Sequence, residues 1–373
     1  MIGMKAIETD DIILPLFSEN LKTYVIPVLG NKKKLKSPLK LADGWRFFED
    51  VVILQKYKNK IYKKILNFNE FVELSNGCQK SKNKLEEIYH NLICKRVSNI
   101  NLDFSKCNLM SVLNLTPDSF FNPSRFENLE NLRKKIEKLK LQEVNIIDIG
   151  AESSRPGAEK ITSEEEIRRL KLFFDNFDVG QLNLKLSLDS RNFKTVSSFV
   201  DYGVLIINDI SGFKDKKFLD LLLNNNVSII IMHMQNNPEK MQENPSYQFP
   251  VIDIYEFFEA KIKFLLDNGV KKSQIIIDPG FGFGKNKIHN LNLLNYFPLF
   301  HSLGYPICAG LSRKSLIDNI YKDKFKSDIS PNQRLSGSLS LQNIAFLNGA
   351  QIIRTHDIFE VQQSFACLEE VYI

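Results

Sequence analysis

Short apolar runs alternate with amphipathic segments along most of this chain. From residue 109 onward, runs rich in β-branched and aliphatic residues are typical of buried parallel strands. We expect eight strands, at Leu109–Leu113, Ile146–Ile149, Leu184–Leu188, Val204–Ile207, Ser228–Met232, Ile275–Ile277, Pro306–Ala309 and Ala350–Ile353. Helical periodicity follows at Leu129–Leu141, Ser163–Phe177, Asn192–Tyr202, Asp215–Asn224, Val251–Asn268, Leu291–Leu303, Gln333–Asn348 and Asp357–Val371. This alternation predicts an α/β fold, a (β/α)8 TIM barrel.

Residues 1–105 do not follow this alternation. Their pattern predicts strands at Ile12–Phe17, Tyr24–Leu29, Val51–Tyr57 and Ile61–Phe68, and a helix at Lys82–Val97. We find no phosphate-binding loop, no paired carboxylates and no RNA-reading pattern in this part. We therefore interpret residues 1–105 as a small α+β N-terminal extension of unknown role, and residues 106–373 as the barrel.

The composition is that of an ordinary globular protein, with 43% hydrophobic and 25% charged residues. The net charge of +6 comes from the first 106 residues, which hold 19 Lys and Arg against 12 Asp and Glu. Lysine-rich stretches are more often solvated loops than binding sites, so we expect no nucleic-acid partner. No apolar run has the length of a membrane span, and the five cysteines are scattered. We expect a cytoplasmic protein without a membrane partner.

Polar side chains follow each expected strand, which is where a TIM barrel carries its reactive groups. Any single one could be a cap or a turn residue, but a complete ring of them predicts an active site. The ring comprises Asn114; Glu152, Ser153, Ser154 and Arg155; Asp189; Asn208 and Asp209; His233 and Gln235; Asp278; Ser312, Arg313 and Lys314; and Arg354 and His356.

These residue types suit a particular chemistry. Asp189, Asn208 and Asp278 can accept hydrogen bonds from the N–H edge of a heterocycle, while Lys314 meets its carbonyl. A diphosphate could be held by the basic residues Arg155, Lys285, Lys314, Arg354 and His356. Asn114 suits Mg²⁺ that is bound mainly by water and phosphate. Such a site can remove diphosphate from a heterocyclic alcohol through electrostatic stabilisation.

The segment DPGFGFGK, Asp278 to Lys285, continues the expected strand Ile275–Ile277 into a glycine-rich turn. Its glycines allow the backbone to approach a ligand closely, and Phe281 and Phe283 offer flat apolar faces to a ring. A Gly-rich turn that only closes a barrel strand is the simpler alternative.

Eight motifs in order resemble those of the dihydropteroate synthases, over about residues 108–373. They are NLTPDSFF (Asn114 to Phe121), DIGAESSRPGAE (Asp148 to Glu159), SLDSR (Ser187 to Arg191), NDISG (Asn208 to Gly212), MHMQ (Met232 to Gln235), DPGFGFGK, SRKS (Ser312 to Ser315) and RTHD (Arg354 to Asp357). The resemblance implies that 6-hydroxymethyl-7,8-dihydropterin diphosphate and p-aminobenzoate condense to 7,8-dihydropteroate and pyrophosphate.

The resemblance also implies roles for individual residues. Four would hold the pterin, namely Asp189, Asn208, Asp278 and Lys314. Three would hold the diphosphate, namely Arg354, His356 and, through Mg²⁺, Asn114. Seven would form the p-aminobenzoate pocket, namely Phe121, Ser154, Arg155, Pro156, Phe283, Lys314 and Ser315. The catalytic set would be Asp189, Lys314, Arg155 and Asn114. Ser154 stands where the family usually has threonine, which leads us to expect an altered response to sulfonamides.

Two other functions fit parts of this pattern. A methyltetrahydrofolate-dependent methyltransferase shares the barrel and the pterin acids. The presence of Arg354, His356 and the SSRPG loop in this chain argues against that function. A pterin-binding paralogue without turnover is the second alternative. The resemblance also implies a homodimer through the helix expected at Gln333–Asn348 and its neighbours, with Gly337 and Ser338 permitting close approach.

Overall fold

The structure, a computed structural model, describes residues 6–9, 21–57, 60–75, 79–116, 125–142, 144–153, 160–238 and 240–372. Eight parallel strands form a closed barrel, because the sheet runs in the order β11-β10-β9-β8-β7-β6-β13-β12 and a bridge from Ile277 to Ile307 joins its two ends. The strands are β6 Asn108–Asn114, β7 Ile146–Gly150, β8 Lys185–Asp189, β9 Val204–Asp209, β10 Ser228–Met232, β11 Ile275–Asp278, β12 Cys308–Gly310 and β13 Ile352–Thr355. The predicted TIM barrel is confirmed.

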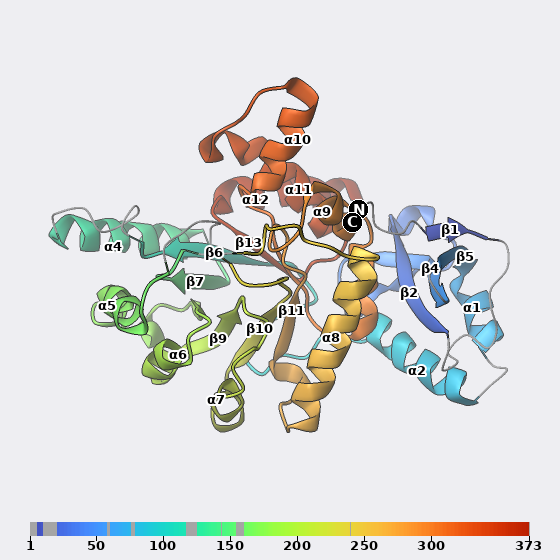
Figure 1. Cartoon of the computed structure of the whole chain (residues 1–373), viewed down its shortest axis with the longest axis horizontal. Helices are drawn as coiled ribbons and strands as arrows, with labels where there is room; N and C mark the ends of the chain where they lie inside the picture. Colours follow the sequence, from blue (N-terminus) through green and yellow to red (C-terminus); the bar gives the residue numbers. More distant parts are fainter. Residues whose placement is uncertain are drawn as a thin grey trace.

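Helices surround the barrel strands (Figure 1). They are α4 Arg125–Leu141, α5 Ser163–Phe174, α6 Phe193–Phe199, α7 Phe218–Asn224, α8 Pro250–Asp267, α9 Lys287–Asn295, α10 Ser315–Phe325, α11 Leu335–Leu347 and α12 Ile358–Tyr372. One helix was expected over Leu291–Leu303, but a 3-10 helix, η6 Phe297–Leu303, follows α9 because Pro298 cannot continue the α-helical hydrogen bonds. The sequence pattern also missed α10, which projects at the top of Figure 1. Among the described residues, no helix is both long and apolar enough to cross a membrane.

A second, smaller sheet precedes the barrel. Its strands are β1 Ala6–Glu8, β2 Lys22–Gly30, β3 Leu39–Lys40, β4 Phe47–Tyr57 and β5 Lys60–Asn67, followed by the helices α1 Phe68–Ser75 and α2 Gln79–Ile93. The sheet runs β1-β5-β4-β2, with β3 on β4. Three of the four expected strands and the helix are confirmed, α1 was missed, and the strand expected at Ile12–Phe17 lies outside the described residues.

The two faces of this N-terminal sheet are buried against different partners. Val25, Val51 and Ile53 pack with α1 and α2, whereas Tyr24 and Leu54 belong to the same apolar cluster as the barrel helices. Successive side chains of a strand point to opposite faces, so one sheet can serve both layers. Figure 1 shows α8 between this sheet and the barrel strands. The N-terminal residues therefore share a core with the barrel.

The end of the barrel where its strands begin is filled by the segment that leads into β6. Ile100, Leu102 and Phe104 pack against inward-facing side chains at the beginning of the strands. Cys308 is one of these and is buried, as its place in a parallel strand predicts. With this end closed, the carboxyl ends of the strands form the open mouth.

Gly337 and Ser338 both make contacts within the chain. A Cβ atom on Gly337 would lie 2.3 Å from Cγ2 of Ile317, so the glycine lets α10 pack closely on α11. Ser338 is buried, and its hydroxyl accepts a hydrogen bond from the Arg313 backbone N–H at 2.8 Å. Their expected role in bringing two subunits together stays a prediction.

Candidate active site

Four strand ends meet side by side at the barrel mouth. Asn114 on β6 lies in register with Gly150 on β7, Gly150 with Asp189 on β8, and Asp189 with Asn208 on β9. A Cβ atom on Gly150 would lie 3.2 Å from Cβ of Asp189, so the glycine leaves room between Asn114 and Asp189. The neutral amides and the carboxylate therefore line one arc of the mouth.

Arg354 enters this arc from β13 and pairs with two acids. Its Nη2 donates to Oδ2 of Asp189 at 2.7 Å, and its Nε donates to Oδ2 of Asp148 at 2.6 Å. Asp148 on β7 is fully buried and also accepts from Nδ2 of Asn208 at 3.1 Å. Our sequence reasoning gave Asp148 no role. An acid inside the apolar run IIDIG could have drawn attention to it, because a carboxylate in a buried strand needs partners.

Burial moves the pKa values of the charged groups in opposite directions. It raises the pKa of Asp189 to about 7, with Arg354 acting against it and Asp148 adding to it. Burial also raises the pKa of Asp278, and it lowers the pKa of Lys314 to about 8, a change that the positive charge of Arg354 reinforces. Strongly perturbed groups that gather at one barrel mouth are typical of an active site.

The loop after β11 has a conformation that requires glycine. Gly280 has φ of +71°, and a Cβ atom there would lie 2.1 Å from the carbonyl oxygen of His233. The Asp278 carboxylate accepts from the Gly280 backbone N–H at 2.7 Å and is nearly buried. The carboxylate is thereby held at the mouth by its own turn.

Two expectations about this loop are wrong. Nζ of Lys285 is buried and donates to the backbone oxygens of Gly280, Phe283 and His233 at 2.8, 2.9 and 3.1 Å, so it cannot serve a diphosphate. Phe281 is buried against Phe297 and offers no face to a ligand. Phe283 lies beside Lys314, whose Nζ is 4.1 Å from the centre of its ring.

The last two strand ends are linked by hydrogen bonds. Nδ1 of His356 lies 3.0 Å from Oγ of Ser312, and Arg313 pairs with Asp357 at 2.6 Å. Ser315 is exposed in the first turn of α10, directly after Lys314. His356 is exposed as well, so its ring can meet a ligand at the rim.

Most of the residues chosen from the sequence thus come from strand ends that surround one mouth. Contacts and charge interactions join Asp189, Asn208, Asp278, Lys314, Arg354 and Phe283. Asn114, His356 and Ser315 lie on adjoining strand ends. Phe121, Ser154, Arg155 and Pro156 lie outside the described residues. In the part of the chain that the structure covers, no group of three His, Cys, Asp or Glu side chains could hold a metal.

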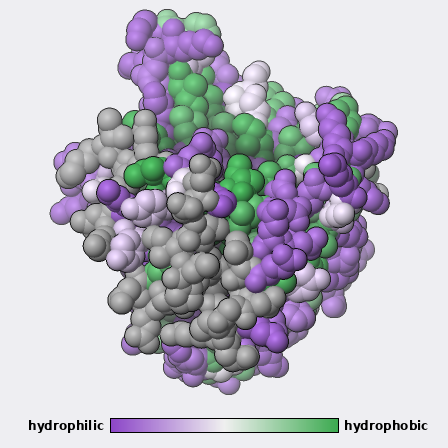
Figure 2. Space-filling view, turned by 90° about the vertical axis from the view of Figure 1, so that its right-hand side faces the viewer, coloured by the Kyte–Doolittle hydropathy of each residue, from purple (hydrophilic) through white to green (hydrophobic). Residues whose placement is uncertain are grey.

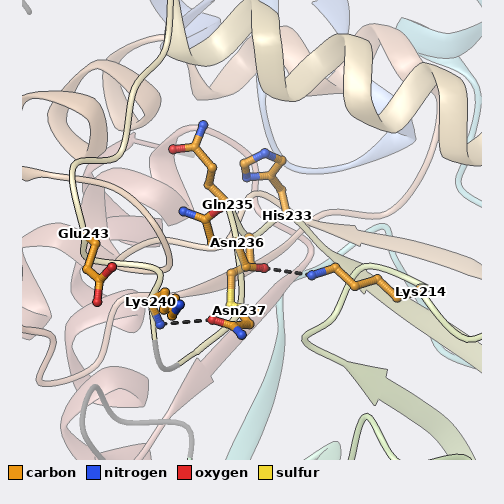
Figure 3. Close-up of a pocket in the computed structure, with 8 residues that line it drawn as sticks. Lys214, His233, Gln235, Asn236, Asn237, Lys240 and Glu243 are labelled. Carbon is orange, nitrogen blue, oxygen red and sulfur yellow. Dashed lines mark hydrogen bonds between the residues drawn. The ribbon is translucent and has the colours of Figure 1, made fainter.

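A separate pocket of about 670 Å³ lies beside the loops that follow β9 and β10. It is lined by Lys214, His233, Met234, Gln235, Asn236, Asn237, Lys240 and Glu243 (Figure 3). Nζ of Lys214 donates to the Asn236 backbone oxygen at 2.7 Å, which ties the two loops together. None of the four residues assigned to the pterin lines this pocket, so we do not assign it to the substrates.

Comparison with known proteins agrees with this geometry. Residues 110–356 match the family model described as pterin binding enzyme. Dihydropteroate synthase of Escherichia coli strain K12 is 34% identical over 272 residues, which cover 72% of this chain and 93% of that protein. A Yersinia pestis dihydropteroate synthase, solved with a sulfonamide drug, superposes with a TM-score of 0.65 at 33% identity and covers 72% of this chain and 95% of its own.

A second solved structure comes from Xanthomonas albilineans. That dihydropteroate synthase, solved with 4-aminobenzoic acid, superposes with a TM-score of 0.64 at 30% identity and covers 72% of this chain and 94% of its own. The chain therefore belongs to the dihydropteroate synthase family of pterin-binding enzymes, transferases of folate biosynthesis that join 6-hydroxymethyl-7,8-dihydropterin diphosphate to p-aminobenzoate and release pyrophosphate.

Proposed function

We propose that the barrel mouth holds the two substrates in three adjoining subsites. The pterin ring would lie against Asp189, Asn208, Asp278 and Lys314. The observation that carries this proposal is the arc of acceptors in register, Asp189 beside Asn208, with the positive charge of Lys314 within electrostatic reach of Asp189 and Asp278. Acceptors suit the N–H edge of the ring, and the ammonium group suits its carbonyl.

The diphosphate would lie at the rim, near Arg354 and His356. Arg354 uses Nε and Nη2 for Asp148 and Asp189, and its Nη1 makes no hydrogen bond to any described residue. Guanidinium groups bind phosphate oxygens through such N–H donors. The exposed ring of His356 would supply a further donor from Nε2 in the tautomer whose Nδ1 accepts from the Ser312 hydroxyl.

Asn114 would bind Mg²⁺ through its side-chain oxygen. The amide is half-buried at the end of β6, and within the described part of the chain it makes no hydrogen bond. A single neutral oxygen ligand fits a Mg²⁺ ion that keeps several waters and is held mainly by phosphate. When bound, Mg²⁺ would stabilise the charge on the departing diphosphate.

The p-aminobenzoate would lie between Phe283, Lys314 and Ser315. The aromatic face of Phe283 suits its ring, and the N-terminus of α10 at Ser315 suits its carboxylate. We assign Phe121, Ser154, Arg155 and Pro156 to the same pocket from their sequence motifs. The catalytic set of this proposal is Asp189, Lys314, Arg155 and Asn114.

The reaction would proceed by loss of the diphosphate first. The bond from the methylene carbon to the diphosphate oxygen breaks, both electrons leave with the diphosphate, and a cation forms on the pterin methylene. The Asp189 carboxylate stabilises this cation. The aniline nitrogen of p-aminobenzoate then attacks the carbon, and the nitrogen loses a proton. No protein nucleophile is required.

Pyrophosphate release tests the proposed roles. We expect the purified protein to release pyrophosphate from dihydropterin diphosphate with Mg²⁺ only when p-aminobenzoate is present. Lys314→Ala should reduce kcat/KM at least about a hundredfold, because it removes a charged contact to the pterin and a neighbour of the p-aminobenzoate pocket. Lys322→Ala is a matched control, since Lys322 lies on the adjoining helix and pairs with Asp328 at the surface.

The alternatives predict different results. A pterin-binding paralogue would be stabilised against heat by the pterin diphosphate without releasing pyrophosphate. A methyltransferase would release none and would be stabilised by methyltetrahydrofolate. Equal activity of Lys314→Ala and Lys322→Ala would remove Lys314 from the site.

We also propose a homodimer through the outer faces of α11 and α12. Ile344 on α11 is 42% exposed and Phe359 on α12 is 58% exposed, and exposed apolar side chains on neighbouring helices favour association. Tyr321 and Phe325 on α10 are exposed as well. Figure 2 shows apolar side chains gathered below the projecting α10 segment. Light scattering should give twice the chain mass, and Phe359→Glu should give one chain mass.

We propose that the chain divides into two parts near residue 105. The N-terminal extension would have a structural role, in which it covers one side of the barrel. Its shared core with the barrel helices supports this role. The four cysteines of the described residues are free thiols, which agrees with a cytoplasmic location.

A further inference from the structure

Asp148 is a buried carboxylate at the centre of the barrel mouth that none of the substrate roles above uses. It is 0% exposed, so it cannot touch either substrate in this conformation. Its Oδ1 accepts from the Ser187 hydroxyl at 2.6 Å, and its Oδ2 accepts from Nε of Arg354 at 2.6 Å and from Nδ2 of Asn208 at 3.1 Å. A carboxylate with this many partners is held rigidly.

The carboxylate decides which way the Asn208 amide faces. An ionised carboxylate only accepts hydrogen bonds, so the amide must direct its NH₂ group toward Asp148. Its oxygen is then directed away from Asp148, and this oxygen makes no hydrogen bond to the described residues. With the opposite orientation, Asn208 would present donors to the N–H groups of the pterin, which would leave both sides unpaired.

The same carboxylate orients Arg354. The planar guanidinium is held at two points, Nε on Asp148 and Nη2 on Asp189, which are 2.6 and 2.7 Å away. Two contacts fix both the position and the plane of the group. Without Asp148, Arg354 would keep only Asp189 and could rotate about that contact.

We propose that Asp148 is a positioning residue for pterin diphosphate: it fixes the Asn208 amide with its oxygen toward the ring and fixes the guanidinium plane of Arg354. This inference rests on the proposed pterin role of Asn208 and diphosphate role of Arg354. Asp148 would thus contribute to substrate recognition by orienting two other side chains, without contacting the substrate itself.

The hydrogen bonds of Asp148 suggest a set of variants that remove its contacts to different extents. In Asp148→Ala, Asn208 and Arg354 lose their common acceptor. In Asp148→Asn, the new amide can still accept from both through its oxygen, provided that its NH₂ group finds an acceptor on the other side. Only Ser187 supplies that acceptor among the described contacts of Asp148, and its hydroxyl can rotate to do so. Ser187→Ala by itself leaves both contacts of Oδ2 intact.

The experiment measures KM for each substrate and the dissociation constant of the pterin diphosphate alone, together with the melting temperature. For Asp148→Ala we expect KM for pterin diphosphate to rise about tenfold or more, with KM for p-aminobenzoate within about threefold of wild type. Asp148→Asn and Ser187→Ala should each change both KM values by less than about fivefold. The double variant Asp148→Asn/Ser187→Ala should lose pterin affinity far beyond the product of the two single effects.

Several outcomes would overturn the inference. If Asp148→Ala lowers only the melting temperature, or raises both KM values equally, Asp148 has a purely structural role. If the double variant equals the product of the single effects, Ser187 does not select the amide orientation. Asn208→Ala separates this inference from the proposed function. If Asn208→Ala leaves pterin affinity unchanged, the role of Asn208 is wrong, whatever Asp148 does.

Discussion

Asp189 and Lys314 carry opposite charges at one buried mouth, and burial moves their pKa values toward each other. The pKa of Asp189 rises to about 7 and the pKa of Lys314 falls to about 8. In the proposed mechanism Asp189 acts as a carboxylate and Lys314 as an ammonium ion. Both are in those forms together only between the two pKa values, so the free enzyme has a narrow active range.

We therefore predict a bell-shaped dependence of kcat/KM on pH. As the pH falls below about 7, Asp189 takes up a proton and the rate falls. As the pH rises above about 8, Lys314 loses a proton and the rate falls again. Lys314→Arg should flatten the alkaline limb, because arginine keeps its charge throughout this range. The measurement is kcat/KM from pH 5 to pH 10 in wild type and variant, and an unchanged alkaline limb in Lys314→Arg would contradict the assignment.

Some residues of the mouth could be identified from the sequence, and others could not. Asp189 and Asp278 end their strands and Asn208 is the last residue but one of β9, so all three could be selected because strand ends meet at the mouth. Lys285 was misjudged because it lies in the same motif, yet its ammonium turns inward to three backbone oxygens. Asp148 was passed over because it lies inside a strand. Sequence spacing indicates the end of a strand, but it does not indicate which partners a side chain finds across the barrel.

At the scale of elements, the loop after β11 depends on the buried Lys285. Its ammonium links the backbone oxygens of Gly280 and Phe283 to that of His233 at the end of β10. Phe283 in turn lies under Lys314. The lysine thus determines the shape of the loop that presents an aromatic face to the proposed p-aminobenzoate pocket.

We predict that Lys285→Met lowers stability and weakens p-aminobenzoate binding. Three buried carbonyls would lose their donor, which costs about 2 to 4 kcal/mol of unfolding free energy. KM for p-aminobenzoate should rise more than KM for pterin diphosphate, because Phe283 is displaced. Lys287→Met is the control, since Lys287 lies nearby but pairs with Asp323 at the surface. Chemical denaturation and steady-state kinetics measure both effects, and equal stability of the two variants would refute the prediction.

The presence and order of the strands and helices could be predicted better than the residues at which they begin and end. Each barrel strand was found because short apolar runs rich in β-branched residues, such as SIIIM and IIID, are typical of buried parallel strands. Helix α10, SLIDNIYKDKF, was missed although its sequence is amphipathic; it projects from the barrel and buries only Leu316 and Ile317. The mouth could be assembled from strand order alone, whereas the inward turn of Lys285 in the loop after β11 could not.

At the scale of the whole molecule, Arg96 joins the N-terminal part to the barrel. It is buried, and its guanidinium donates to the backbone oxygen of Asn91 in α2 at 2.5 Å and to that of His301 in η6 at 3.0 Å. The backbone oxygens near the ends of helices lack partners within the helix. Burial lowers the pKa of Arg96 to about 10, so it remains charged at neutral pH. One side chain therefore satisfies the ends of two helices from the two parts of the chain.

We predict that Arg96→Met loosens the N-terminal sheet from the barrel without changing the chemistry. The loss of charged hydrogen bonds to buried carbonyls should cost about 2 to 4 kcal/mol and lower the melting temperature by about 3 to 5 °C. Limited proteolysis should then cut first within the N-terminal hundred residues, because the shared core at Tyr24 and Leu54 opens before the barrel does. Arg168→Met is the matched control, since Arg168 is exposed and pairs with Glu165 on its own helix. Because none of the described contacts of Arg96 is to a residue of the mouth, kcat and both KM values should stay at wild-type levels wherever the variant is folded. A stable variant with reduced kcat would show instead that the N-terminal part takes part in catalysis.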